Sequence, residues 1–385
     1  MEHIVSEEKC CGCGGCAAVC PRNAIDMAMS ADGFFIPKIR TDVCVDCHLC
    51  EKVCPQRSTE PAPTEKLPHP LPYSFIHRDK EILQKASSGG LGWALAQAMF
   101  SRGWSAVGVR YDAARNIACH FKADTLEDFA DSMNSKYLQS FTADAFSRLF
   151  DGKKYIVFGT PCQIDALRRM IQLRGQEQNF LLVDFFCHGV PSYHVWYRYL
   201  RRHLKNDRLT SAKWRDKSHG WHSYTMRLDS AGKTHVSTLG NHDFFLNSFL
   251  GNLALNLPCY SCKYRHTASS ADIRIGDFWG EKYQHNDTGV SAALAFTPAG
   301  ESILGSLTEY GTLGEEALSD ILAGQISDPY DPFPGRKNFL AGLIKGKPLW
   351  FLYCRYNWKM LIKNLLPLSF KRFLKRMLKS GKGRS

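Results

Sequence analysis

Cysteine is the residue type that most clearly points to chemistry in this sequence. The chain holds 15 cysteines, and nine of them lie before residue 57. Eight of these nine form two runs with the spacing C-x2-C-x2-C-x3-C, and each run is followed by proline. The runs are Cys10, Cys13, Cys16 and Cys20, and then Cys44, Cys47, Cys50 and Cys54. Because three thiolates on a tight loop can face one metal cluster, this spacing predicts two [4Fe–4S] clusters.

The fourth cysteine of each run decides how the ligands are shared, because with this spacing it binds the cluster of the other run. The first predicted cluster is held by Cys10, Cys13, Cys16 and Cys54, and the second by Cys20, Cys44, Cys47 and Cys50. Cys11 falls outside this register and is predicted to be a packed or partly exposed thiol. Paired zinc sites are the alternative, but structural zinc usually takes two separated ligand pairs. The segment resembles two-cluster bacterial ferredoxins over its whole length.

Four further cysteines stand at suggestive places, namely Cys162, Cys187, Cys259 and Cys262. Cys162 and Cys187 each follow an apolar run, "KYIVF" and "NFLLVDF", that predicts a buried strand. Because the carboxyl ends of adjacent parallel strands share one edge of a sheet, these two thiols are expected to meet there. The C-x2-C pair then completes a third four-thiolate site. The alternative is two buried structural thiols and a chance or zinc-binding pair, and Cys119 and Cys354 are predicted to be structural.

The elements that must position these cysteines alternate between strand-like and helix-like patterns, which predicts an α/β domain. Strands are expected at 105–112, 154–159 and 179–187, and helices at 91–103, 161–175 and 191–204. The helix at 161–175 opens with proline and ends at glycine, as helices often do. The proline-rich stretch "STEPAPTEKLPHPLP" predicts an extended linker. The predicted divisions are residues 1–56, 57–72, 73–330 and 331–385.

Composition bounds the location and the partners. Apolar content of 44% and charged content of 22% are ordinary for a globular protein. The first residues lack a secretory pattern and no apolar run is long enough to span a bilayer, so a cytoplasmic location with reduced thiols is expected. The net charge of +12 equals the surplus of twelve Lys or Arg after residue 344, where no Asp or Glu occurs. The rest of the chain is neutral, which argues against a nucleic-acid partner.

The basic tail has helical periodicity. Apolar residues recur at Phe370, Phe373, Leu374, Met377 and Leu378, with most basic residues on the other side. Together with the aromatic stretch at 349–368, this predicts an in-plane helix at an anionic membrane surface, peripheral at the inner face of the membrane. The alternative is a C-terminal helix that packs on the domain with a solvated basic face.

Beyond the linker the sequence resembles a known family. The motifs "SSGGLGWALAQAMFSRGW", "SKYLQS", "GTPCQIDALR", "FFCHGVPS", "WRDKSHGW", "CYSCKYR" and "ADIRIGDFWG" occur in this order. They resemble the coenzyme F420 hydrogenase/dehydrogenase beta subunit family over about residues 73–285, and similar bacterial proteins with a fused ferredoxin are often encoded among polysaccharide-biosynthesis genes. The resemblance implies an α/β flavin-binding domain. Together with the cysteine runs and the basic tail, the expected fold is an α+β ferredoxin-like dicluster module followed by this α/β flavin-binding domain and a basic helical C-terminal tail. The resemblance also implies FAD and a cluster on the four later cysteines, whereas the deazaflavin coenzyme F420 is its least secure implication.

Candidate cofactor contacts follow from these motifs. Ser87 or Ser88 is expected to cap a helix whose start approaches the FAD pyrophosphate. A cation and an amide in "SKYLQS" would stabilise the reduced flavin anion. The candidates are Ser87, Ser88, Gly89, Gly90, Lys136, Tyr137, Gln139, Ser140, Gly159, Thr160, Pro161, Lys217 and Asp277. On sequence alone, a capped helix start and a solvated loop are the alternatives for the first two motifs.

The predicted function is that of an iron–sulfur flavoprotein oxidoreductase. Electrons from a ferredoxin-like redox partner would pass through the clusters to FAD and on to a small organic substrate or a hydride-carrying coenzyme, and the reverse direction is equally compatible with the sequence. The catalytic residues stay unassigned. The first alternative is a non-catalytic electron-transfer subunit that feeds a partner enzyme, and the second is a scaffold that uses the clusters structurally.

Overall fold

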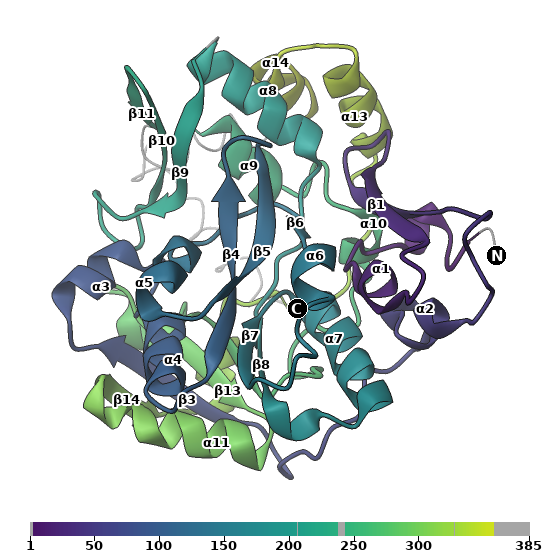
Figure 1. Cartoon of the computed structure of the whole chain (residues 1–385). Coiled ribbons are helices and arrows are strands. Elements are labelled where there is room, and N and C mark those ends of the chain that lie inside the picture. Colours follow the sequence, from purple (N-terminus) through teal and green to yellow (C-terminus); the bar gives the residue numbers. More distant parts are fainter. Residues whose placement is uncertain (1–2, 206, 238–242, 327, 358–385) are drawn as a thin grey trace, which may run out of the picture.

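The two cysteine runs belong to a small N-terminal module that lies at one side of the molecule (Figure 1). The computed structural model describes residues 3–205, 207–237, 243–326 and 328–357. In the module, strands β1 (Ile25–Met29) and β2 (Phe35–Ile39) pair antiparallel. Each cysteine run leads into a short helix, α1 (Gly15–Val19) or α2 (Leu49–Lys52). The 4Fe–4S runs therefore sit on an α+β unit, as the sequence predicts.

A nine-stranded mixed sheet forms the larger domain, in the order β14-β3-β13-β12-β8-β7-β4-β5-β6. Its strands are β3 (Leu71–His77), β4 (Ser105–Asp112), β5 (Ile117–Ala123), β6 (Ser140–Phe141), β7 (Tyr155–Phe158), β8 (Phe180–Phe185), β12 (Ile273–Asp277), β13 (Ser291–Ala295) and β14 (Gly311–Glu315). The central strands β4, β7, β8 and β12 run parallel to one another. The expected strands at 105–112, 154–159 and 179–187 are all present, and the parallel pairing of β7 with β8 brings their carboxyl ends to one edge.

Helices cover both faces of this sheet because successive strand residues point to opposite sides. On β7, Ile156 and Phe158 pack under α4 and α11, whereas Tyr155 and Val157 pack under α6, α7 and the α1 helix of the module. These helices are α4 (Leu91–Phe100), α11 (Pro298–Gly305), α6 (Ala143–Phe146) and α7 (Pro161–Arg174). Shorter helices α3 (Lys80–Lys85), α5 (Leu126–Phe129), α10 (Leu257–Tyr260) and α12 (Leu318–Leu322) fill the connections. The module thus completes one face of the sheet.

A third layer packs beyond the sheet. The strands β9 (Leu209–Asp216), β10 (Thr225–Ser230) and β11 (Thr234–Val236) form a small antiparallel sheet. The helices α8 (Tyr193–Leu204), α9 (Phe244–Leu250), α13 (Arg336–Ile344) and α14 (Leu349–Tyr356) share its apolar core. Leu349 and Leu352 are 2% exposed in this core. The prediction that residue 349 onward lies in a membrane plane is therefore wrong for α14, which packs on the domain, while residues 358–385 lie outside the described residues.

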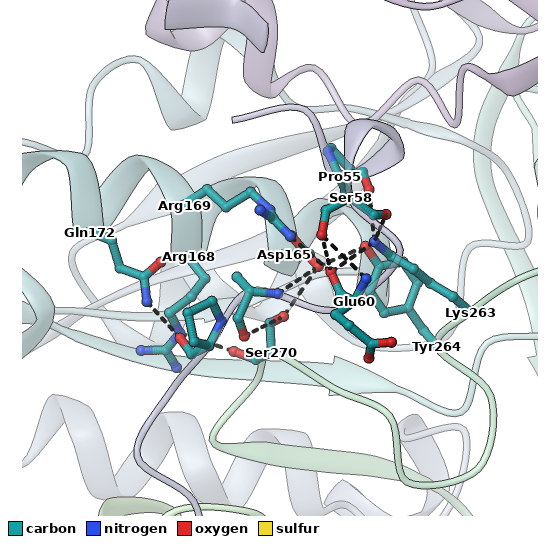
Figure 2. A network of polar contacts seen from close by, with 12 residues as sticks. Pro55, Ser58, Glu60, Asp165, Arg168, Arg169, Gln172, Lys263, Tyr264 and Ser270 are labelled. Atoms are coloured by element: carbon teal, nitrogen blue, oxygen red, sulfur yellow. Dashed lines mark hydrogen bonds and ion pairs between the residues drawn. The ribbon is translucent and has the colours of Figure 1, made fainter. Parts of the chain in front are cut away.

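The proline-rich linker is fixed along the domain surface. Ala62 is 1% exposed, and its N–H donates to the Asp165 carboxylate on α7 at 3.0 Å. The Asp165 carboxylate also accepts from the Tyr264 hydroxyl at 2.8 Å and from Arg169 Nε at 2.5 Å (Figure 2). The Lys263 ammonium donates to three carbonyls on the chain between Pro55 and Glu60. The linker is therefore extended, as predicted, but it is anchored at a buried acidic side chain.

Substitution Asp165→Asn is expected to release this segment. The amide has the size of the carboxylate but cannot accept all of the donors that surround it, and buried donors left unpaired cost about 1–3 kcal/mol each. Limited proteolysis should cleave the variant faster within residues 58–66 than the wild-type protein. Asp26→Asn, at an exposed side chain 3.5 Å from Arg40, is the control and should cleave like wild type. Equal cleavage of Asp165→Asn and wild type would contradict the anchoring.

Candidate iron–sulfur and cofactor site

The first cysteine set lies in the interior of the module and comprises Cys10, Cys13, Cys16 and Cys54. Cys10, Cys13 and Cys16 are at most 9% exposed. Burial raises the pKa of Cys10 to about 12 and that of Cys54 to about 11, and the charges of neighbouring thiols add to both shifts. Thiolates that are buried and repel one another are stabilised by a positively charged metal group. This set therefore fits a [4Fe–4S] cluster.

The second set lines a small separate cavity and comprises Cys20, Cys44, Cys47 and Cys50. Cys47 is exposed to solvent, whereas Cys50 is buried. The charge of Cys50 contributes to the raised pKa of Cys16, so the two sets are neighbours. In the structure Cys54 groups with the first run and Cys20 with the second. This grouping supports the crossed ligand assignment, which stays a prediction.

The two cysteine runs share one backbone conformation. Gly12 and Asp46 occupy the same place in their runs and have φ of 65° and 47°. Gly14 and His48 are the next equivalent pair, with φ of 75° and 59°. A positive φ is uncommon outside glycine and costs about 1–2 kcal/mol in other residues. Because Asp46 and His48 adopt it nevertheless, the sequence repeat is also a repeat of backbone conformation at these two positions.

The core set is the third group of thiols and comprises Cys162, Cys187, Cys259 and Cys262. Cys162 is the second residue of α7, which follows β7, and Cys187 comes shortly after β8. Burial raises the pKa of Cys187 to about 12, and the Cys262 charge adds to this shift. Burial also raises the pKa of Cys259, with Cys187 as the next cause. The structure therefore brings together the thiols that the sequence proposed to group, and their donor chemistry fits a third cluster.

Cys11 has surroundings that the sequence analysis missed. Its thiol lies close enough to Cys13 of the first set and to Cys162 of the core set for the three groups to shift one another's pKa. The interaction lowers the pKa of Cys11 and raises that of both partners. The thiol that appeared surplus in the register therefore lies between two sets of candidate ligands.

A cavity of about 670 Å³ opens beside the core set, at the carboxyl ends of β7, β8 and β12. This volume is within the usual range for a cofactor site. Cys187 and Cys262 both line it. Ten of the predicted contacts line it as well, namely Ser87, Ser88, Gly90, Lys136, Tyr137, Ser140, Gly159, Thr160, Pro161 and Asp277. The cavity is therefore bounded by the motifs "SSGG", "SKYLQS" and "GTP".

Three predicted contacts do not line the cavity. Gly89 packs against the backbone of β3 and of Ser291. The Lys217 ammonium donates to the carbonyls of Leu83, Ser88 and Thr288. Gln139 is 2% exposed and faces the module, where its Oε1 accepts from Phe35 N at 2.6 Å. The prediction that these three residues contact the cofactor is therefore wrong, because their side chains or backbones contact other parts of the protein and not the cavity.

The expected serine cap is also wrong. Helix α4 begins after Gly90, which has φ of 82°, and no side chain caps it. Ser87 Oγ instead accepts from Ser135 N at 2.7 Å, and Ser88 Oγ donates to Val290 O at 2.7 Å. The two serines therefore join "SSGG" to the loop that carries "SKYLQS" and to β13, and so shape the wall of the cavity.

Arg215, which the sequence analysis did not single out, forms a wall of the cavity together with the predicted contact Asp277. Arg215 is 2% exposed and pairs bidentately with Asp277, at 2.8 and 2.9 Å. Trp221 Nε1 donates to the same carboxylate at 2.7 Å and stacks on Trp279, with 5.2 Å between ring centroids. Arg215 and Trp221 both lie in "WRDKSHGW", and Asp277 lies in "IGDFWG". The motifs signalled these residues, but only the tertiary structure shows that they meet.

Three cationic or aromatic side chains of the cavity wall are Trp93, Arg215 and Arg265. Arg265 is 9% exposed, and its Nη2 donates to Cys259 O at 2.8 Å. Two guanidinium groups therefore lie at the cavity, and positive charge of this kind suits an anionic cofactor.

His188, which follows Cys187, also faces the cavity. Its Nε2 lies 2.7 Å from Asn252 Oδ1, and its ring is 4.7 Å from the Phe249 ring. Phe249 in turn stacks on Tyr137 at 4.9 Å. Burial lowers the pKa of His188 below its usual value, which keeps the imidazole neutral. Aromatic faces therefore line the cavity next to the cysteine side, where a planar ring system can stack.

Comparison with known families confirms the resemblance read from the motifs. Residues 152–321 match the family described as the C terminus of the coenzyme F420 hydrogenase/dehydrogenase beta subunit. Residues 9–58 match the 4Fe-4S dicluster domain. The first match includes all four cysteines of the core set, and the second includes both cysteine runs.

Curated relatives match parts of the chain. One F(420)H(2) dehydrogenase subunit, from Methanosarcina mazei, is 24% identical over 218 residues, which are 50% of this chain and 57% of the relative. A polyferredoxin-like protein of Methanocaldococcus jannaschii is 37% identical over 94 residues, 22% of this chain and 56% of the relative. Pyruvate synthase subunit PorD of Thermotoga maritima is 35% identical over 63 residues, 16% of this chain and 60% of the relative. The chain thus spans 56–60% of the length of these relatives.

Among solved structures, the F420-reducing [NiFe] hydrogenase complex from Methanosarcina barkeri contains a similar chain. The sequence identity is 19% and the TM-score 0.47, and the match covers 71% of this chain and 87% of that chain.

Proposed function

We propose that this chain, which joins a 4Fe-4S dicluster domain to a domain of the coenzyme F420 hydrogenase/dehydrogenase beta subunit family, is an iron–sulfur flavoprotein oxidoreductase. The observation that carries the proposal is the shared wall between the core cysteine set and the large cavity, which Cys187 and Cys262 both line. Electrons from a ferredoxin-like partner would enter at the module and reach a small organic substrate or a hydride-carrying coenzyme at the cavity. Coenzyme F420, which the relatives' names mention, enters the proposal only as a candidate substrate.

The residues of the cavity would hold FAD and set its surroundings. FAD, when bound, links one-electron chemistry to two-electron hydride chemistry. Trp93, Arg215 and Arg265 line the cavity and would contact it. Asp277 and Trp221 hold the Arg215 guanidinium in place. The aromatic side chains near Cys187 exclude water from the side that faces the core set.

Anaerobic purification with iron, sulfide and flavin analysis tests the proposal. About twelve iron atoms and one FAD per chain are expected for three cubanes and a flavin. About eight iron atoms would contradict the presence of a cluster at the core set. The absence of flavin would contradict the proposed oxidoreductase activity. Clusters that dithionite cannot reduce would favour the scaffold.

Trp93→Phe tests the placement of the flavin. The change removes the indole N–H of a side chain that lines the cavity and keeps an aromatic ring, so we expect FAD affinity to fall by about two- to tenfold, the size of one hydrogen bond. Fluorescence titration of the deflavinated protein measures this affinity. Trp104→Phe is the control, because Trp104 contacts Lys154 away from the cavity and should leave the affinity unchanged. Equal affinities for the two variants would place the flavin elsewhere.

FAD binding should weaken as the pH rises through about 7. Burial lowers the pKa of Lys136 to about 7, and the Asp131 charge offsets this only in part. Lys136 Nζ donates to Asp131 O at 2.8 Å and to Met133 O at 2.7 Å beside the cavity. The protonated ammonium attracts an anionic cofactor, so loss of the proton above pH 7 should raise the Kd by about two- to fivefold. Titrations from about pH 6 to about 8.5 should show this rise in the wild-type protein and a flat profile in Lys136→Met.

A non-catalytic electron-transfer subunit is the second candidate function. Two relatives, an F(420)H(2) dehydrogenase subunit and a pyruvate synthase subunit, are parts of larger enzymes, which favours it. Steady-state assays of the purified chain with reduced ferredoxin and candidate small molecules separate the two. Turnover without any partner enzyme supports the oxidoreductase, and turnover only after a partner is added supports the subunit.

Peripheral attachment to an anionic membrane is proposed from the basic tail. No helix among the described residues has the length and apolarity to cross a membrane. Phe370 and the basic residues around it lie outside the described residues. Vesicle co-sedimentation with and without phosphatidylserine tests the attachment, and deletion of residues 358–385 should abolish binding that depends on this lipid.

A further inference from the structure

We propose that the loop from Cys10 to Cys13 is the electron-transfer junction between the module and the core cysteine set, with Cys11 as the sulfur between them. The inference rests on the proposed function and adds a role for a residue outside the ligand register. One electron would pass from a [4Fe–4S] cluster held by the first cysteine set, which would be oxidised by one unit, to a cluster held by the core set, which would be reduced by one unit. No bond forms or breaks and no proton moves. A low-potential ferredoxin-type protein supplies the electron from outside.

The contacts of Cys11 are the first observation. Its thiol lies near a candidate ligand of the first set, Cys13, and near a candidate ligand of the core set, Cys162. The Cys11 charge also acts on Cys10 and Cys54 on the module side. On the domain side it acts on Cys259 and Cys262. Cys11 is therefore close to both sets at once.

The second observation is a hydrogen-bond clamp that holds this loop against the domain. The carbonyl oxygens of Cys10, Cys11 and Cys13 each accept a hydrogen bond from a different buried side chain. The donors are Asn256 Nδ2 at 3.0 Å, Gln139 Nε2 at 3.1 Å and Thr142 Oγ1 at 2.6 Å. All three donor residues are at most 5% exposed. Three separate side chains of the domain thus fix the position of the loop through hydrogen bonds to its backbone.

Glycine makes this close approach possible. A Cβ atom at Gly12 would lie 2.0 Å from Gln139 Nε2, and one at Gly14 would lie 2.1 Å from Thr142 Oγ1. Both distances are well inside atomic contact, so any side chain at these positions would push the loop away from the domain. The second run has Asp46 and His48 at the equivalent positions, and its Cys47 is exposed to solvent. The first run therefore faces the core set, while the second run is the side open to a donor.

Gln139 and Thr142 are positioning residues in this account, because they act through the backbone of the loop. Their hydrogen bonds fix the distance between the first set and the core set. A loop displaced by about 1 Å can slow a step that depends on position by up to about a hundredfold. Loss of the Thr142 hydroxyl should therefore slow transfer without removing any ligand.

Substitution Cys11→Ala in the intact, cofactor-loaded chain tests the junction. We expect the iron content and the melting temperature to match those of wild type. The magnetic interaction between the reduced clusters, seen as broadening in the EPR spectrum, should weaken. Flavin reduction by reduced ferredoxin in stopped-flow mixing should slow by about tenfold. Cys119→Ala, at a buried cysteine outside all three sets, is the control and should behave like wild type.

A matched pair at Thr142 gives the second arm. Thr142→Val removes the donor and keeps the shape, and it should slow flavin reduction, whereas Thr142→Ser keeps the hydroxyl and should keep the rate. If the wild-type protein holds about twelve iron atoms and Cys11→Ala has unchanged EPR spectra and rates, the role of Cys11 in the junction is overturned and the proposed function is not. Loss of about four iron atoms in Cys11→Ala would make Cys11 a ligand and overturn it as well. About eight iron atoms in wild type would overturn the core cluster of the proposed function, and the junction with it.

Discussion

The double variant Cys10→Ser/Cys54→Ser is expected to lose about four iron atoms per chain, no more than either single variant. The reason is that the structure groups Cys54 with the first run, so both substitutions damage the same cluster. Cys47→Ser/Cys54→Ser should lose about eight iron atoms, because Cys47 lines the other cavity and belongs to the other cluster. Iron analysis of anaerobically purified variants measures both losses.

The two double variants control each other. If each run kept its own cluster, the pattern would reverse, and Cys47→Ser/Cys54→Ser would lose the smaller amount. EPR spectra add a second criterion, since Cys10→Ser and Cys54→Ser should leave the same remaining signal. A different residual spectrum in these two variants would count against the crossed assignment.

Arg274→Leu is expected to lower the free energy of unfolding by about 3–5 kcal/mol, the usual effect of breaking a buried ion pair. Arg274 and Asp184 are 1% and 0% exposed and make two hydrogen bonds of 2.7 Å. The guanidinium also donates to the carbonyls of Tyr264, His266 and Ala268, at 3.0, 2.7 and 3.0 Å. Leucine would leave the Asp184 carboxylate buried without its counter-charge and free the loop after Cys262. Urea denaturation followed by circular dichroism measures the change.

Arg227→Leu is the matched control for this prediction. Arg227 pairs with Asp229 at 3.1 Å, but the two side chains are 38% and 24% exposed. Solvent screens such a pair, so its removal should change the free energy of unfolding by less than about 1 kcal/mol. Similar destabilisation by the two leucine variants would show that the buried pair has no special role in stability.

Much of the local structure was predictable because its signals are short-range. Helix α7 begins at Pro161 behind a capping box of Thr160 and Gln163, and it ends at Gly175 with φ of 59°. These residues fix φ or supply cap hydrogen bonds within one turn, so no distant contact is needed. The apolar runs of β7 and β8 predicted buried strands for the same reason, and their parallel pairing then placed Cys162 and Cys187 at one edge.

Side-chain direction was not predictable from the motifs. "SKYLQS" contributes Lys136 and Tyr137 to the cavity, but Gln139 turns away from it and binds the module. Ser87 and Ser88 appeared suited to cap a helix, yet their hydroxyls bind Ser135 N and Val290 O. In each case a partner far away in sequence decided the outcome.

The sequence by itself determined the metal chemistry of the module, because the ligand spacing C-x2-C-x2-C-x3-C-P is a property of a single short loop. It also determined the order of strands and helices that bring the later cysteines to one sheet edge. Only the tertiary structure placed Cys11 near Cys13 and Cys162, which come from two domains. It alone showed that the linker is anchored at Asp165 and that Arg215 meets Asp277. The physical reason is that spacing fixes which thiols can share a loop, whereas the contacts of a side chain depend on every element packed around it.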